Sequence, residues 1–242
     1  MGVCMTTAST MGRRRRTLWG LMAVSAIGIA AFAVPPYLSG DPANSNLAIN
    51  PDATLHFLSL VVHAVPSGLA LLIGPLQFLT PLRDRHPRLH RIAGRVYMVS
   101  VVCGSLAALF AATFSVSGFP AQVAFYVLTA AWLYSLVQAY RCIRRGEARL
   151  HRIWMIRNYA LTFAAVTLRV YLVIGMVLSK QYTWLTFEDV YTASVWASIL
   201  INVIVAEYVI VQGIVASTAR RRRRESASPA PAVTPGPAER EG

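Results

Sequence analysis

Charged side chains are scarce in this sequence, which has 14% Asp, Glu, Lys and Arg against 55% hydrophobic residues. A soluble domain of ordinary composition has about 25% charged residues. Because charge is costly in hydrocarbon, the deficit excludes an ordinary soluble enzyme and indicates a chain that lies mostly within a lipid bilayer.

Cysteine and the common catalytic motifs are also scarce or absent. The three cysteines, Cys4, Cys103 and Cys142, form no CxxC pair, so no disulfide framework is predicted. The sequence contains no Walker motif, no GxGxxG, no HExxH and no GxSxG. The chemistry that these motifs carry is therefore not predicted, and whether the protein is an enzyme is left open.

Long apolar runs are abundant. A helix needs about 20 apolar residues to cross a bilayer, and six segments reach this length. They are 17–37, 55–80, 92–117, 120–140, 153–179 and 190–216. The predicted fold class is all-α, a polytopic membrane helical bundle of six transmembrane helices. This transmembrane domain, 17–216, is predicted to lie between a basic N-terminus, 1–16, and a disordered tail, 217–242, which is basic and then Pro/Ala-rich.

The positive charges lie in four clusters that all fall on one side of the six predicted spans. The opposite connections contain Lys180 alone among Lys and Arg. By the positive-inside rule, both termini are predicted in the cytoplasm. The arginine-rich composition is typical of a bacterial protein, so we expect the bacterial inner (cell) membrane. The basic clusters are expected to contact anionic lipid, and no nucleic-acid partner is predicted.

Polar residues inside the predicted spans are candidate functional residues, because polar groups are costly in lipid. In 55–80 and 153–179 they recur at spacings of 3, 4 and 7, which places them on one face of each helix. The predicted buried polar pocket consists of His63, Ser67, Gln77, Asn158, Thr162, Arg169, Asn202 and Glu207. Arg169 is the costliest of them, and Glu207, the only acidic residue inside a span, is its expected partner.

A second candidate site lies where two predicted spans begin. LHRI occurs at 89–92 and again at 150–153, and each copy opens a span that runs in the same direction. His90 and His151 are then expected at equal depth in one bundle, as bis-histidine ligation of haem b requires. A quinone head group or a lipid phosphate would suit the same geometry. The arginines placed to bind such a group are Arg91, Arg95, Arg152 and Arg157. No metal-ion site is predicted, because Pro87 makes His86 a residue that precedes the helix.

Two motifs carry a resemblance to a known family. HPRLHRIAGRVY, at 86–97, and HRIWMIRNYALTFAAVTLR, at 151–169, resemble a DUF2306-like family of predicted bacterial membrane proteins. The resemblance extends over about 56–216 and includes IGPLQF at 73–78. It implies a multi-pass membrane protein and carries no reaction. Its motif residues map here to His90, Gly94, Arg95, Tyr97, His151, Trp154, Arg157, Asn158, Tyr159 and Arg169.

Three function classes fit these features. The first, and the best fit, is a membrane redox protein that binds haem b or quinone between helices at His90 and His151. The second is a transporter or lipid-handling protein that uses His63 and Arg169 to bind a small anion. The third is a non-catalytic membrane partner of a larger complex. The sequence names no substrate, oligomeric state or pathway.

Overall fold

The protein is all-helical in the computed structural model, which describes residues 3–227, with side chains described for Arg13 and for 16–219. In chain order the elements are α1 Val3–Ala33, α2 Pro35–Leu38, the 3-10 helix η1 Pro42–Asn44, α3 His56–Gln77, α4 Thr80–Arg85, α5 Pro87–Thr113, α6 Phe119–Arg144, α7 Ala148–Thr162, α8 Ala164–Ser179 and α9 Phe187–Ala227. The predicted all-α fold class is confirmed.

Six helical segments are long and apolar enough to cross a membrane. They are Arg16–Leu38, His56–Gln77, Pro87–Thr113, Phe119–Arg144, Ala148–Ser179 and Phe187–Ala219. All six predicted spans are therefore confirmed. The third begins earlier than the apolar run 92–117, because Pro87 stands in the first turn of α5, where its fixed φ favours helix and its missing N–H is not needed.

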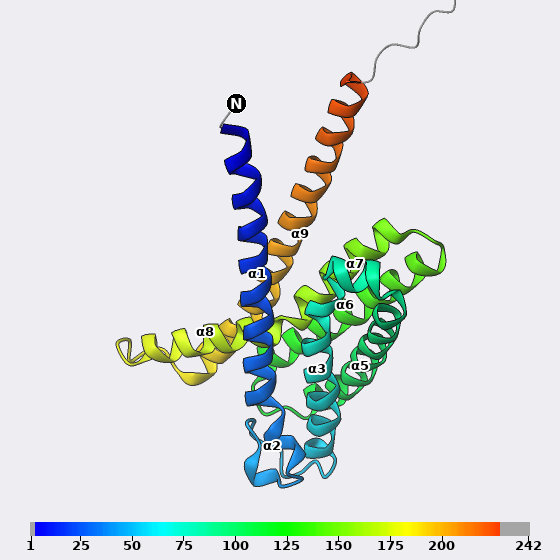
Figure 1. The fold of residues 1–242 in the computed structure, drawn as a ribbon. Coiled ribbons are helices and arrows are strands. Elements are labelled where there is room, and N and C mark those ends of the chain that lie inside the picture. The colour runs from blue at the N-terminus through cyan, green and yellow to red at the C-terminus, as the bar shows by residue number, and fades with distance from the viewer. Residues whose placement is uncertain (1–2, 228–242) are drawn as a thin grey trace, which may run out of the picture.

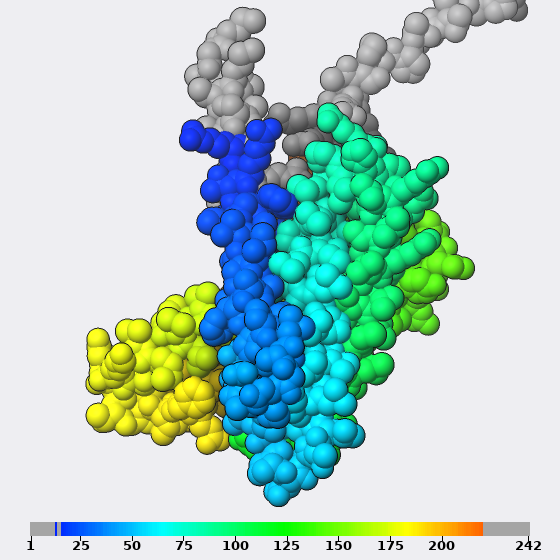
Figure 2. Space-filling model, turned by 60° about the horizontal axis from the view of Figure 1, so that its bottom comes forward, coloured from blue at the N-terminus to red at the C-terminus, as the bar shows by residue number. Residues whose placement is uncertain are grey.

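The segments alternate in direction, so that α1 begins and α9 ends toward the same end of the molecule (Figure 1). We call this end the terminal end and the opposite one the far end. α3 packs along α5, α6 along α7, and α8 along α9. The α8–α9 hairpin projects sideways from the other helices and forms a separate lobe beside α1 in Figure 2.

α3 continues through two internal prolines, Pro66 and Pro75. A proline removes the helical hydrogen bond to the carbonyl four residues earlier, which for Pro75 is that of Leu71. Tyr159 of α7 donates its hydroxyl to the Leu71 carbonyl at 3.2 Å, and Trp19 of α1 donates its indole N–H to the Pro75 carbonyl at 3.0 Å. Since an unsatisfied carbonyl is costly in lipid, these contacts hold α1 and α7 against α3.

The fifth span is interrupted at Phe163, between α7 and α8. The cause is a side chain rather than a proline. Asn202 of α9 donates its amide to the Ala160 carbonyl, in the last turn of α7, at 2.9 Å, and to Thr167 Oγ1 of α8 at 3.1 Å. A side chain inserted into the hydrogen-bond ladder is a known cause of kinks. α9 thus binds the chain on both sides of the break between α7 and α8.

At the C-terminus, α9 continues to Ala227. The backbone of 217–227 is therefore helical, where the sequence predicted disorder. Residues 1, 2 and 228–242 lie outside the described residues, so the disorder expected for the Pro/Ala-rich stretch stays a prediction.

Candidate functional site

The most extensive polar network joins α5, α6 and α7 inside the bundle. Tyr97 of α5 donates its hydroxyl to Asn158 Oδ1 at 2.7 Å and lies 2.9 Å from Thr162 Oγ1. On α6, Trp132 donates its indole N–H to Thr162 Oγ1 at 2.9 Å. Asn158 in turn donates to the Trp132 carbonyl at 2.8 Å and to Ser135 Oγ at 2.9 Å.

These five side chains are buried, and Tyr97 and Asn158 are 0% exposed. Each polar atom of Asn158 already has a protein partner. A buried network whose members are all satisfied makes a core rigid and leaves no atom free for a ligand. Asn158 and Thr162, both in the predicted polar pocket, therefore hold three helices together.

A second pair of residues occupies the corresponding positions of α5 and α7, two turns closer to the terminal end. His90 lies seven residues before Tyr97 on α5, and His151 lies seven residues before Asn158 on α7. Both helices begin at the terminal end, so seven residues return each histidine to the same helix face, about 10 Å from the Tyr97–Asn158 bond. His90 and His151 therefore lie at the same level of α5 and α7, which Tyr97 and Asn158 join, and within electrostatic range of each other.

α6 contributes to both levels. The Nδ1 atom of His151 lies 2.8 Å from the carbonyl oxygen of Ala139, seven residues after Trp132, whose carbonyl Asn158 binds. Because a carbonyl only accepts, Nδ1 of a neutral His151 carries the proton and Nε2 carries the lone pair. The hydrogen bond to α6 therefore fixes the tautomer of His151.

The Tyr97–Asn158 pair and the His90–His151 pair differ in whether a hydrogen bond joins α5 to α7. Tyr97 and Asn158 bond directly, whereas no hydrogen bond joins His90 to His151. Nδ1 of His90 is buried without a partner, and so is Nε2 of Gln77 at the end of α3. The Gln77 amide lies beside Gly94, one turn after His90, because a Cβ on Gly94 would be 3.4 Å from Gln77 Oε1. At the terminal end, one buried nitrogen on α3 and one on α5 thus lack hydrogen-bond partners.

The neighbouring arginines fall into two groups. Arg91, Arg95 and Arg152 are exposed near the histidines. Arg157 is engaged, since its Nε and Nη2 donate to the two carboxylate oxygens of Glu207 at 2.5 and 2.9 Å. Its guanidinium also lies 4.6 Å from the centre of the Trp154 ring.

The expected Arg169–Glu207 pair is therefore wrong. Glu207 lies toward the terminal end of α9, where α9 packs against α7. Arg157 on α7 is at that level, and its planar fork takes both carboxylate oxygens. A cavity of about 150 Å³ lies beside the pair, between α6, α7 and α9.

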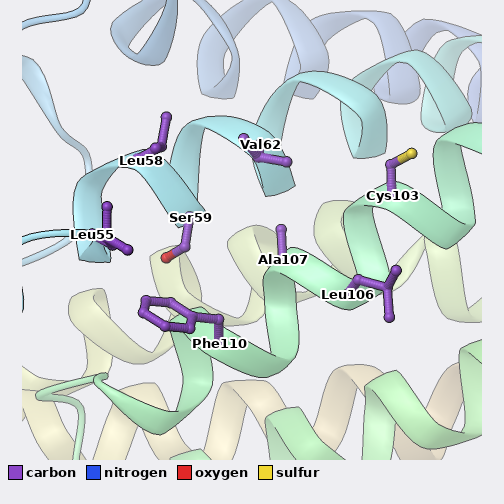
Figure 3. Close-up of a pocket in the computed structure, with 8 residues that line it drawn as sticks. All are labelled: Leu55, Leu58, Ser59, Val62, Cys103, Leu106, Ala107 and Phe110. Atoms are coloured by element: carbon purple, nitrogen blue, oxygen red, sulfur yellow. The ribbon is translucent and has the colours of Figure 1, made fainter.

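His63 and Ser67 close the contact between α3 and α5. Nδ1 of His63 lies 2.9 Å from the Gly104 carbonyl oxygen and 3.4 Å from Ser67 Oγ. Gly104 permits this approach, because a Cβ there would overlap Ser67 Oγ. Nearer the far end, α3 and α5 form a shallow apolar groove of about 400 Å³, lined by side chains such as Leu58, Val62 and Phe110 (Figure 3). Neither this groove nor the cavity beside Glu207 includes His90 or His151.

Arg169 has no acidic partner. Its Nη1 donates to the Ala165 carbonyl of its own helix at 2.7 Å. Among the described side chains, the ion pairs are Arg83–Asp84 and Arg157–Glu207. Arg169 is only partly exposed on α8, and a lone Arg in mid-membrane costs at least about 2.5–3.5 kcal/mol. The predicted pocket residues are thus distributed over several separate contacts.

The comparison with known proteins identifies the family. Residues 60–210 match the family described as Predicted membrane protein (DUF2306), which is more than half of the chain. The chain belongs to this family. No curated protein and no solved structure matches it. The family that the two sequence motifs suggested is thereby confirmed, and the protein is a multi-pass membrane protein.

The DUF2306 match contains both histidines of the α5–α7 interface, Arg169 and Glu207, whereas Trp19 and Tyr37 precede it. Sequence reasoning missed the part played by α6. A signal existed in the spacing of Trp132, Ser135 and Ala139, which share one helix face. The carbonyls that bind Asn158 and His151 had no signal, because every residue carries one.

Proposed function

We propose that this DUF2306 protein is a redox protein of the bacterial inner membrane, with both termini in the cytoplasm, that holds one haem b between His90 and His151. The observation that carries the proposal is the repeated register of α5 and α7. Tyr97 and Asn158 bond directly at one level, and two turns away the contact is left open between two imidazoles. An iron that accepts one nitrogen from each helix would close it.

The two histidines would have unequal roles. His151 has its Nδ1 fixed by the Ala139 carbonyl, the arrangement typical of histidines that ligate metals through Nε2. His90 lacks such an outer acceptor, so we expect that it would hold the haem less firmly than His151. The exposed Arg91, Arg95 and Arg152 would bind the propionates at the cytoplasmic surface, while Arg157 is already committed to Glu207.

A quinone head group is a second candidate, favoured by a specific observation. Gln77 Nε2 is a buried donor without an acceptor, and His90 Nδ1 is buried without a partner close by. Quinone carbonyl oxygens accept hydrogen bonds from such groups. The two candidate cofactors differ in the residues that bind them. Haem requires His90 and His151, whereas the quinone requires Gln77 and His90.

An absorption spectrum decides the proposal. The full-length protein is purified in mild detergent from haem-replete cells, and its spectrum is recorded before and after dithionite. We expect a Soret band that His151→Ala abolishes and that His90→Ala converts to a five-coordinate spectrum. His86→Ala is the matched control, since His86 is an exposed neighbour of His90 and should leave the spectrum unchanged.

A colourless preparation, or a spectrum indifferent to both histidine variants, overturns the haem proposal. In that case, quinone extracted from the purified protein by organic solvent is quantified. The second candidate requires the bound quinone to fall in Gln77→Ala and His90→Ala and to stay constant in His86→Ala. A colourless preparation that also yields no quinone rules out both cofactors.

A further inference from the structure

Among the described side chains, Arg169 is a partly buried charge to which the proposed haem or quinone site gives no role. It lies on α8, ten residues before Ser179 at the far end of the helix, whereas His90 and His151 lie at the terminal end. One N–H of its guanidinium donates to the Ala165 carbonyl, which leaves most of its donors unused. A guanidinium is always charged in proteins, so it cannot reduce its cost by losing a proton.

Other donor groups act electrostatically on Arg169. Tyr37 of α2, Tyr191 of α9 and His63 of α3 lie within electrostatic range of it. Tyr37 and Tyr191 are only 6% and 8% exposed, so their rings form protein walls rather than surface. α2, α3 and α9 therefore each bring a donor side chain within electrostatic range of Arg169, and no described carboxylate forms an ion pair with it.

The acidic residues of the far end are placed elsewhere. Asp41 caps η1 by accepting the Ala43 N–H at 2.9 Å. Asp189 accepts hydrogen bonds from the Thr186 N–H at 3.1 Å and from the Thr186 hydroxyl. Glu188 lies against Gly118, at the start of α6. Asp52 is exposed in the connection before α3. None of the four pairs with Arg169, so a negative charge beside the guanidinium would have to come from outside the described side chains.

We infer that Arg169 binds the carboxylate of a membrane-soluble acid. A single guanidinium balances a single negative charge, and its two parallel N–H groups match the two oxygens of a carboxylate. A phosphate dianion would need a second cation, and the next one along the far end, Lys180, is exposed. The attraction between a carboxylate and the guanidinium is also stronger in a lipid environment, where water does not screen it.

The direction of entry follows from the projecting α8–α9 hairpin. Val170 and Val173, on the turn after Arg169, are 48% and 64% exposed, so the described chain leaves them largely uncovered. The approach to Arg169 is therefore apolar. An acid with an acyl chain would reach the guanidinium from the lipid, with its chain remaining in the bilayer.

Binding is measured on the full-length protein in nanodiscs of zwitterionic phosphatidylcholine, with empty nanodiscs as background. The probes are radiolabelled sodium laurate, sodium acetate and inorganic phosphate. We expect saturable binding of laurate that weakens by about tenfold or more in Arg169→Gln. Arg169→Lys, which keeps the charge but loses the fork, should lie between the two. Arg88→Gln removes an exposed arginine at the start of α5 and should bind as the wild type does.

The three probes distinguish three classes of ligand. Acetate binding with the same dependence on Arg169 keeps the carboxylate site but assigns it a water-soluble acid, which overturns the membrane source. Phosphate binding as strong as laurate binding overturns the carboxylate class. Absence of laurate binding to the wild type, or equal binding by Arg169→Gln, overturns the site itself. Where Arg169→Gln fails to fold, the intermediate binding expected of Arg169→Lys remains the test of the site, and none of these results depends on haem or quinone.

Discussion

Polar side chains in the membrane-spanning part differ in how fully their hydrogen-bonding capacity is used. Asn158 has a partner for its oxygen and two for its amide nitrogen, while Arg169 bonds only to its own helix. Gln77 and His90 each retain a buried nitrogen without any partner. Because satisfied networks stabilise and unsatisfied groups cost free energy, this difference separates structural residues from candidate binding residues.

The role of Asn158 is testable by substitution. Asn158→Ala removes three interhelical contacts and leaves the Tyr97 hydroxyl short of its acceptor. We expect the free energy of unfolding to fall by about 1–2 kcal/mol, because hydrogen bonds between membrane helices reach about 1.7 kcal/mol at most and the variant also leaves a small void. Unfolding is followed by denaturant titration in detergent micelles.

Asn46→Ala is the matched control, since Asn46 is exposed in the connection between η1 and α3 and makes no side-chain hydrogen bond. An equal effect of both substitutions on the free energy of unfolding would show that the Asn158 network does not stabilise the protein. A change in haem or quinone content in Asn158→Ala without loss of stability would instead assign Asn158 to the cofactor.

Which residues are polar and buried could be predicted from the sequence, but their partners could not. The stripe that contains Asn158, Thr162 and Arg169 was visible from helical spacing. Glu207 was assigned to Arg169 because it is the only acidic residue inside a predicted span, and residue type alone does not choose between two arginines on the fifth span. Arg157, on α7, meets Glu207 instead.

At the scale of elements, α3 and α7 approach each other where a glycine meets an aromatic ring. Gly74 of α3 lies directly under the Tyr159 ring of α7, because a Cβ on Gly74 would overlap the ring carbons Cε2 and Cδ2. This approach also brings the Tyr159 hydroxyl to the Leu71 carbonyl freed by Pro75. The glycine, the proline and the tyrosine therefore act together to join α3 and α7.

Gly74→Ala is expected to destabilise the protein by about 1–3 kcal/mol, the usual effect of overpacking a core, because the Tyr159 ring must move away from Leu71. Thermal unfolding monitored by tryptophan fluorescence measures the change. Gly28→Ala on α1 is the control, because a Cβ there meets no atom within 4 Å and alanine favours helix. An unchanged unfolding midpoint in Gly74→Ala would show that α3 and α7 do not pack as closely as described.

At the scale of the whole molecule, the spans were predictable and their directions in space were not. Apolar runs of membrane length identify helices because lipid offers the backbone no alternative partner. The break between α7 and α8 coincides with Asn202 binding a carbonyl on another helix, and this interaction leaves no pattern in the sequence. The charge clusters do predict which side of the membrane each connection faces. This rule depends on the Lys and Arg residues of each connection and not on how the helices pack.

The orientation is open to a direct test. A reporter enzyme that works only outside the cytoplasm is fused in turn at Asn46 and at Glu147. With both termini cytoplasmic, we expect activity at Asn46 and none at Glu147, because one span precedes Asn46 and four precede Glu147. A reporter that reads only in the cytoplasm should give the reverse pattern. Activity of the first reporter at Glu147 would contradict the orientation assigned to the chain.

The Tyr159–Leu71 contact also bears on how the chain is made. The two residues are 88 positions apart, so α3 leaves the ribosome long before α7 exists. Until then the Leu71 carbonyl has lost its helical donor to Pro75 and lacks its final one. We expect the nascent α3 to stay beside the insertion machinery, where water reaches its backbone, and to enter lipid only with α7. Synthesis would then deliver the second to fifth spans as one unit rather than as a series of independent insertions.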